Sequence, residues 1–349
     1  MFFANGGGAC YVMSVGSYNN TLSEVYRGNK NLILDNIRNE HDINLLVIPE
    51  AVNVKECMDI YRDLLNELCG SGKYFAILDV PRKKPDEDDS APEDFFRNTF
   101  YADNLQFAAA YYPWLETSVL SDKDIDEKMF IGDYNKLDPC DRERLVKKVK
   151  DYLNLLPPSA AVAGLYSATD NAYGVWKAPT DVTLKCVKNP EESIDSERQI
   201  YLNTPQNGKS INVIRYFPGE GTKVKGARTL DGNSPQWKYV NARRTMTFLE
   251  QTIRDTAETY ASEPNNAQTW NKLKCVINNF LHNVWERGGL AGAVPEDAYS
   301  VHVGLGETMI DKDILEGIMS ITVMAAISNP SDFIGINIRQ QMQKSYIKK

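Results

Sequence analysis

Apolar residues are spaced differently in the two halves of this chain, and each spacing predicts a different architecture. In the N-terminal half, residues 43–48 (INLLVI) form a nearly continuous apolar run, which is typical of a strand covered on both faces. Residues 54–68 instead show helical spacing, with Cys57, Tyr61 and Leu64 on one face. Similar patterns predict strands at 10–15, 74–80 and 106–112, and a helix at 22–37. Strands that alternate with helices indicate an α/β domain with a mostly parallel sheet.

The C-terminal half contains longer periodic segments. In residues 241–260, apolar residues such as Leu249 and Ile253 recur at steps of three and four, which predicts a helix with one buried stripe. Residues 265–287 repeat the pattern, and Gly288 follows as a stop signal. The alternation of short apolar runs predicts strands at 212–215, 222–228, 301–303, 319–327 and 334–338, with a capped turn at 311–315. We therefore expect an α+β domain in which two long helices pack on a mixed sheet.

The last predicted strand has one apolar face and lies near the end of the chain. Its isoleucines alternate with other residues in the order Ile334, Gly335, Ile336, Asn337, Ile338 and Arg339. A terminal strand of this kind can complete its own sheet or extend the sheet of a neighbouring molecule. Both possibilities are open from the sequence.

The middle of the chain is more polar. Residues 83–94 place six carboxylates within nine residues without a turn glycine, which favours a solvated loop over a calcium site. Residues 141–155 are charged and helix-prone, and Pro157 and Pro158 precede a small-residue segment that suits a closely packed helix. Residues 185–210 are predicted to be loop-rich. We therefore place a domain boundary near residue 190, which gives domains 1–190 and 191–349.

Composition narrows the class of protein. The chain has 349 residues, of which 42% are hydrophobic and 25% charged, as expected for a globular protein of two or three domains. A net charge of −8 argues against direct nucleic-acid binding. No apolar run approaches the ~20 residues that a membrane span needs, and the N-terminus lacks the features of a signal peptide. The six cysteines show no CxxC spacing, which favours reduced thiols in a cytosolic protein.

Motifs for catalysis are missing from the sequence. The three histidines, His41, His282 and His302, are far apart in the chain, and no HExxH, CxxC or GxSxG element occurs. We therefore expect no catalytic residue, no cofactor and no metal. The best argument for an enzyme is that Glu50 and Asp79 lie at the carboxyl ends of predicted parallel strands, where α/β sheets bind ligands.

Several segments, taken in order, resemble one known family. They are FFANGGGACYV at the N-terminus, a proline-led helix that ends in Gly174, Lys177, Ala178 and Pro179, then GARTLDG (226–232), KYVNARR (238–244) and WERGGLAGAVPEDAY (285–299). Together they resemble the contractile tail sheath proteins of phage tails, tailocins and related injection systems. The resemblance identifies Gly226, Arg228, Asn241, Arg243, Arg244 and Gly288 as structural motif residues. In that family the N-terminal stretch follows an N-terminal arm, so this chain is expected to lack the arm.

The resemblance implies a mechanical and not a catalytic protein. Its outer α/β domain and inner C-terminal domain would form stacked hexameric rings around an inner tube protein. Baseplate and cap proteins would be further partners, in a particle assembled in the cytoplasm with no membrane contact. The strand predicted to exchange between subunits contains Phe333, Ile334, Ile336, Ile338 and Arg339, and the possible tube contacts are Lys272, Lys274 and Arg287. The alternatives are a small-molecule enzyme on the N-terminal half and a static baseplate or cap protein with the same C-terminal fold.

Overall fold

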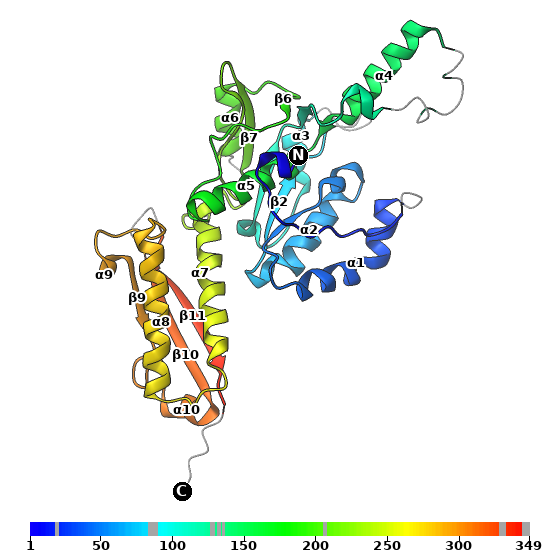
Figure 1. Cartoon of the computed structure of the whole chain (residues 1–349). Coiled ribbons are helices and arrows are strands. Elements are labelled where there is room, and N and C mark those ends of the chain that lie inside the picture. The colour runs from blue at the N-terminus through cyan, green and yellow to red at the C-terminus, as the bar shows by residue number, and fades with distance from the viewer. Residues whose placement is uncertain are drawn as a thin grey trace. The chain divides into compact units, whose positions relative to one another are not determined.

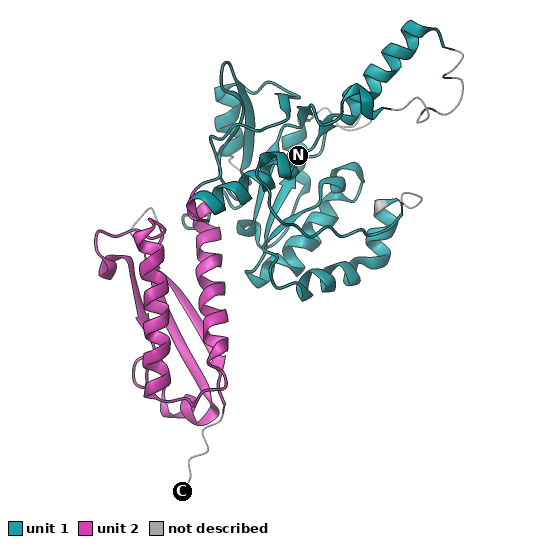
Figure 2. Ribbon diagram, viewed as in Figure 1, with its two compact units in different colours: residues 1–172, 178–240 teal, residues 173–177, 241–349 magenta. Residues whose placement is uncertain are grey.

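The computed structural model describes residues 1–17, 21–82, 90–125, 130, 134, 137–204, 208–327 and 333–343. The chain is a mixed α/β protein that divides into two compact units (Figures 1 and 2). Unit 1 contains residues 1–172 and 178–240, and unit 2 contains residues 173–177 and 241–349. Residue 190 therefore lies inside unit 1, because the segment after it supplies two strands to the unit 1 sheet.

Unit 1 is built on a five-stranded sheet with the order β1-β2-β3-β7-β8. The strands are β1 (Leu45–Val47), β2 (Phe75–Asp79), β3 (Ala108–Tyr112), β7 (Ile211–Phe217) and β8 (Gly221–Lys225). The first four pair in parallel and β8 is antiparallel to β7, so the mostly parallel sheet predicted for this half is confirmed. Every residue of β2 and β3 is buried. Continuous apolar runs are the expected sequence of such doubly covered strands.

Helices cover both faces of this sheet. Alternate residues of β2 belong to two separate cores: Ala76 and Leu78 join one that includes Leu64 of α2, while Phe75 and Ile77 join one that includes Tyr166. The helices of unit 1 are α1 (Leu22–Asn39), α2 (Cys57–Glu67), α3 (Pro92–Thr99), α4 (Pro139–Leu153), α5 (Ser159–Tyr173) and α6 (Ser196–Asn203). A small second sheet contains β4 (Leu115–Thr117), β5 (Leu155–Leu156) and β6 (Val187–Pro190).

Two local predictions for unit 1 are wrong, and a third is wrong only for the last residues of its segment. Residues 10–15 form no strand: they pair with no strand among the described residues, and Val12 is 89% exposed. An alternating pattern predicts extended backbone, but a strand also needs a partner, which no described residue supplies here. Residues 185–210 contain β6 and α6 and are not mainly loop. Of the acidic run, residues 83–89 lie outside the described part, while Glu93 is buried in α3 and is not solvated.

Unit 2 has two long helices on one face of a three-stranded sheet (Figure 1). The helices are α7 (Val240–Thr259), which begins at the last residue of unit 1, and α8 (Ala267–Glu286). The strands are β9 (Tyr299–His302), β10 (Ile318–Ala326) and β11 (Phe333–Gln341), in the order β11-β10-β9, and all pairs are antiparallel. Two short helices, α9 (Pro295–Ala298) and α10 (Asp311–Glu316), lie in the connections. The mixed sheet predicted under these two helices is therefore wrong: the described strands of unit 2 form an antiparallel sheet, and a mixed sheet is found in unit 1.

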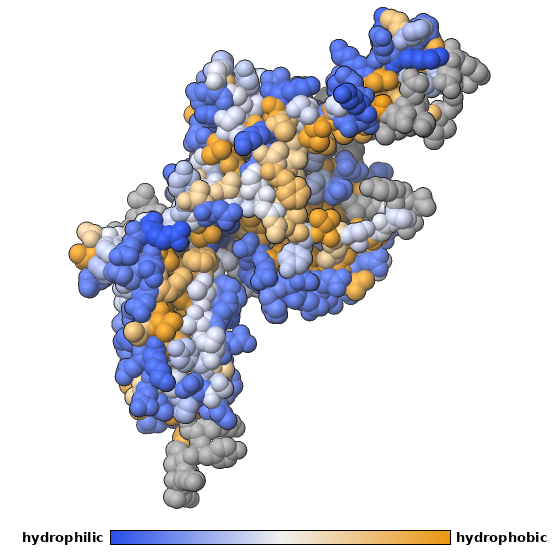
Figure 3. All heavy atoms as spheres, viewed as in Figure 1, coloured by the Kyte–Doolittle hydropathy of each residue, from blue (hydrophilic) through white to orange (hydrophobic). Residues whose placement is uncertain are grey.

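The buried side chains of unit 2 follow the predicted stripes. Those of α7 and α8 recur at helical spacing, and those of β10 and β11 alternate: Met246, Leu249, Ile253, Ala257, Leu273, Ile277, Leu281, Met319, Ile321, Val323, Ile336 and Ile338. The rings of Phe248 in α7 and Phe280 in α8 meet edge to face, with centroids 5.6 Å apart. On the visible face of unit 2, apolar residues gather in a narrow band between the two helices, and the rest is mainly hydrophilic (Figure 3).

Candidate functional site

The strand predicted to be exchanged, β11, pairs with β10 of the same chain. The register runs over nine residue pairs, from Ile318 opposite Gln341 to Ala326 opposite Phe333. Ile336 and Ile338 are buried, whereas Phe333 is 42% exposed and Arg339 faces solvent. In the single chain the strand therefore completes its own sheet. Because β11 is the outermost strand, its second edge has no strand partner among the described residues.

The three candidate tube contacts do not converge on one surface. Lys272 and Lys274 are on α8, and each has an acidic partner: Lys272 Nζ lies 4.0 Å from Glu263, and Lys274 Nζ lies 3.9 Å from Glu307. Arg287 follows the other end of α8, where its guanidinium lies 5.0 Å from the ring centroid of Trp176. Of the two lysines, Lys272 is the more available, with 61% of its side chain exposed against 38% for Lys274.

Two of the motif residues, Gly226 and Arg228, belong to a tight crossing of chain segments in unit 1. The buried side chain of Asn212 on β7 accepts a hydrogen bond from the Arg228 amide at 2.8 Å and donates to the Arg228 carbonyl at 2.7 Å. Gly226 has a φ of +118°, and a Cβ there would lie 2.9 Å from the Asn212 side-chain oxygen. The glycine is thus required both by its backbone conformation and by the close approach of Asn212.

The other motif residues lie in unit 2 at helix ends. Asn241 donates from its side chain to the Trp176 carbonyl at 3.2 Å. Arg243 is buried and forms an ion pair with Glu250 at 3.1 Å, and Arg244 is also buried. Gly288, with a φ of +78°, ends α8: its amide donates to the Trp285 carbonyl, and the next amide donates to the Val284 carbonyl. This pair of bonds is the Schellman motif, and it confirms Gly288 as the helix stop.

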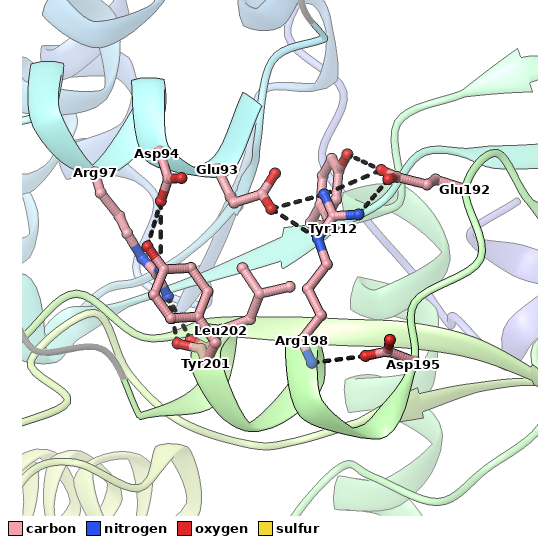
Figure 4. Close-up of polar contacts among 9 residues, drawn as sticks. All are labelled: Glu93, Asp94, Arg97, Tyr112, Glu192, Asp195, Arg198, Tyr201 and Leu202. Carbon is pink, nitrogen blue, oxygen red and sulfur yellow. Dashed lines mark hydrogen bonds and ion pairs between the residues drawn. The ribbon is translucent and has the colours of Figure 1, made fainter. Parts of the chain in front are cut away.

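A polar network that the sequence analysis missed joins α3 to α6 in unit 1 (Figure 4). The Arg198 guanidinium donates through Nε and Nη2 to one Glu93 oxygen, at 2.9 and 2.7 Å, and also pairs with Glu192. Glu192 in turn accepts from the Tyr112 hydroxyl. Burial alone would raise the pKa of Glu192, but its bonds with Arg198 and Tyr112 hold the pKa below the usual value. A second buried arginine on α3, Arg97, donates to the carbonyl of Leu202 at 2.7 Å.

This network is structural in character. Glu93 is 2% exposed, and its partner comes from 105 positions further along the chain, so the pair fixes α6 against α3. Arg198 satisfies one oxygen of Glu93, while the second oxygen, Oε2, is buried without a hydrogen-bond partner, and Glu192 on the other side of Arg198 is 40% exposed. This network could not be predicted from the sequence, because Glu93 and Arg198 both occur in polar segments whose composition is typical of a solvated surface.

The comparisons with known proteins point to one family. Residues 233–329 match the sequence profile of the phage tail sheath C-terminal domain. Over 100 residues the chain is 32% identical to a prophage major tail sheath protein of Pseudomonas aeruginosa (strain UCBPP-PA14), which covers 28% of this chain and 25% of that protein. The sheath complex of an extracellular contractile injection system, PVC, in its contracted state matches with 33% identity and a TM-score of 0.69, over 95% of this chain and 76% of that one. This chain belongs to the contractile tail sheath family.

A second sheath structure extends the comparison. The helical sheath of the anti-feeding prophage in its contracted state is 30% identical, with a TM-score of 0.68, and covers 95% of this chain and 78% of that one. The fold of this tail sheath protein is therefore shared across both of its units. The stretch matched in the curated Pseudomonas relative is only a quarter of that relative's length.

The residues that favoured an enzyme take structural positions in this tail sheath protein. Asp79 is 1% exposed, and its carboxylate accepts a hydrogen bond from the Ser159 amide at the start of α5, 2.7 Å away. Burial raises its pKa to about 7. Glu50, in contrast, lies exposed on the 3-10 turn of residues Pro49–Asn53. A buried helix cap and a surface residue do not form an accessible pair of carboxylates.

The two histidines of unit 2 are also bonded to neighbouring side chains. His302 bonds to Glu307 at 2.6 Å and to Ser300 at 3.0 Å, and His282 lies 3.4 Å from Glu286. Both are thus engaged with neighbours in unit 2. Within the described ranges, no three side chains of His, Cys, Asp or Glu are grouped so that they could hold a metal ion. Among the helices of the described residues, none has the length and apolar character needed to cross a membrane.

Proposed function

We propose that this chain is the structural subunit of a contractile sheath. Copies assemble as stacked hexameric rings around an inner tube, and contraction drives the tube through a target envelope. The main support for this proposal is the structural similarity to two contracted sheaths, which extends over 95% of the chain. The subunit is not an enzyme, it assembles in the cytoplasm, and its partners are further copies, the tube, the baseplate and the cap. The enzyme alternative has no support of comparable extent.

The proposed link between subunits is the β11 strand. Its inner face carries Ile336 and Ile338, and its edge toward β10 carries the backbone groups that would pair with the same strand of a neighbouring copy. A strand held by backbone hydrogen bonds keeps its partner while the globular bodies rotate. Donation of β11 to a neighbour must break its pairing with β10, and pairing with a neighbour restores the same number of bonds. The exchange therefore costs little once the neighbour is close.

A reversible disulfide across β10 and β11 tests the donation. Thr322 and Asn337 are directly opposite in the register, and their side chains are 3.0 Å apart, so the double variant Thr322→Cys/Asn337→Cys can lock the strand to its own sheet. The exposed native cysteines are first replaced by serine: Cys10, Cys140, Cys186 and Cys275. Electron microscopy then compares the oxidised and reduced protein, expressed with its neighbouring sheath components.

The expected result is sheath formation by the reduced variant and its loss in the oxidised one. The single variant Thr322→Cys is the control and should assemble under both conditions. If the oxidised double variant forms ordinary sheaths, β11 stays in its own sheet and the donated role is wrong. If the reduced double variant and the control also form no sheath with all partners present, the sheath function itself loses support.

The tube contact is a separate proposal that rests on α8. Lys272 is its best candidate because most of its side chain is exposed and its acidic partner is 4.0 Å away. A change of Lys272 to Glu should weaken tube co-purification more than the same change at Lys274 or Arg287. Equal retention of the tube by all three variants would remove α8 as the contact.

A further inference from the structure

Trp176 occupies a closely fitted slot within unit 2. Its backbone carbonyl accepts the hydrogen bond from the Asn241 side chain, and its ring stacks with the Arg287 guanidinium. A Cβ added to Gly174 would lie 2.4 Å from the Trp176 ring, and one added to Gly289 would lie 2.9 Å from it. The indole therefore fits only because glycine stands at both positions.

The two glycines after α8 have different reasons to be glycine. Gly288 has a φ of +78°, but a Cβ there would meet no atom within 4 Å, so only its backbone conformation requires glycine. Gly289 has no such φ, and its Cβ would lie 2.9 Å from Trp176 and 2.6 Å from Val284. Gly288 is thus needed to end the helix, and Gly289 is needed for the packing of Trp176.

Trp176 lies in the short segment that returns the chain to unit 1. The chain passes between the units at 172/173, 177/178 and 240/241. Two of these crossings fall at helix ends, since α5 ends at Tyr173 and α7 begins at Val240. If residues 173–177 were free, five residues could span about 17 Å and would restrain the units very little. When Trp176 lies in its slot, the segment is fixed to unit 2 at this residue, and the chain leaves that fixed point in both directions.

We propose that Trp176 is a positioning residue that couples the two units by pinning residues 173–177 to unit 2. A second pinned attachment, beside the one through α7, restricts the angles through which the units can move. In a contracting sheath this coupling passes the displacement of one unit to the other. That last step rests on the proposed function, whereas the pinning itself does not.

The native cysteines allow a direct measurement on the isolated subunit. Cys186 is exposed in unit 1 and Cys275 is exposed in unit 2, so both can carry spin labels once Cys10 and Cys140 are changed to serine. Electron paramagnetic resonance then gives the distribution of distances between the labels. Trp176→Ala and Gly289→Ala are expected to broaden this distribution at least twofold, because each vacates or obstructs the slot.

Two controls separate pinning from general damage. Gly288→Ala strains the same helix end without touching Trp176, so it should lower the thermal midpoint of unit 2 and leave the distance distribution narrow. Trp176→Phe retains a ring in the slot and should restore a narrow distribution. Distributions that stay narrow in both Trp176→Ala and Gly289→Ala would overturn the proposal, and so would equal broadening by Gly288→Ala. Sheath assembly is scored separately by electron microscopy, so failure of the sheath function does not alter the outcome.

Discussion

The sheets of the two units bury their residues in different ways. In unit 1, all residues of β2 and β3 are buried, because helices cover both faces of a mostly parallel sheet. In unit 2, β10 and β11 alternate buried with more exposed residues, and the edge of β11 has no strand partner in the described chain. Changes in the unit 1 sheet should therefore act on folding. In unit 2, the face of the residue decides whether a change acts on folding or on association.

The largest effect is expected where charge is buried beside the unit 1 sheet. Arg198→Met removes the partner of Glu93, which is 2% exposed, and should lower the free energy of unfolding of unit 1 by about 3–5 kcal/mol. Urea denaturation measures the change. The matched control is Arg144→Met, whose ion pair with Asp141 is 73% and 50% exposed and should contribute less than about 1 kcal/mol. Equal losses in the two variants would show that the network carries no special stability.

The next effect concerns the end of β2. Burial raises the pKa of Asp79 to about 7, above its value of 3.8 in the unfolded chain. Between those values the folded state holds a proton that the unfolded state has lost, so stability falls as pH rises from about 4 to 7 and then levels off. The loss from this single group is roughly 4 kcal/mol, at 1.36 kcal/mol for each pKa unit.

Asp79→Asn removes this dependence and keeps an oxygen that can accept from the Ser159 amide. Compared with the native chain, the variant should gain stability at pH 8 and differ little at pH 4. Thermal unfolding across this range, with Glu50→Gln as a surface control, measures the difference. Parallel pH curves for the Asp79→Asn variant and the native chain would show that Asp79 is not protonated in the folded state.

The sequence was sufficient for elements whose signal is local. The apolar run at 43–48 and the stripe of Leu249 and Ile253 predicted β1 and α7, because burial of a face imposes its period on the chain. Pairing partners are not local. Residues 10–15 have the pattern of a strand without its partner, and Arg198 meets Glu93 across 105 positions.

The residues of the candidate site also divide into those with a local sequence signal and those without one. Gly288 was predictable as a helix stop, because the Schellman motif is formed by consecutive residues. The slot around Trp176 was not, because it joins Gly174, Asn241 and Gly289 from three separate segments. The pattern of β11 predicted a strand with one buried face, but whether it pairs within its own chain depends on tertiary structure.

The smallest effect is expected in β11, where substitutions on the two faces of the strand can be compared directly. Ile336 is 3% exposed and its neighbour Asn337 faces solvent, so adjacent positions test the alternation. Ile336→Ala should lower the free energy of unfolding of unit 2 by about 2–4 kcal/mol, through lost burial and the cavity left behind. Asn337→Ala should change it by less than about 0.5 kcal/mol, since exposed positions rarely carry stability. Urea denaturation of both variants, followed by tryptophan fluorescence, gives the two values. If the two losses are alike, the sheet of unit 2 is covered on both faces, as in unit 1, and β11 has no face reserved for association.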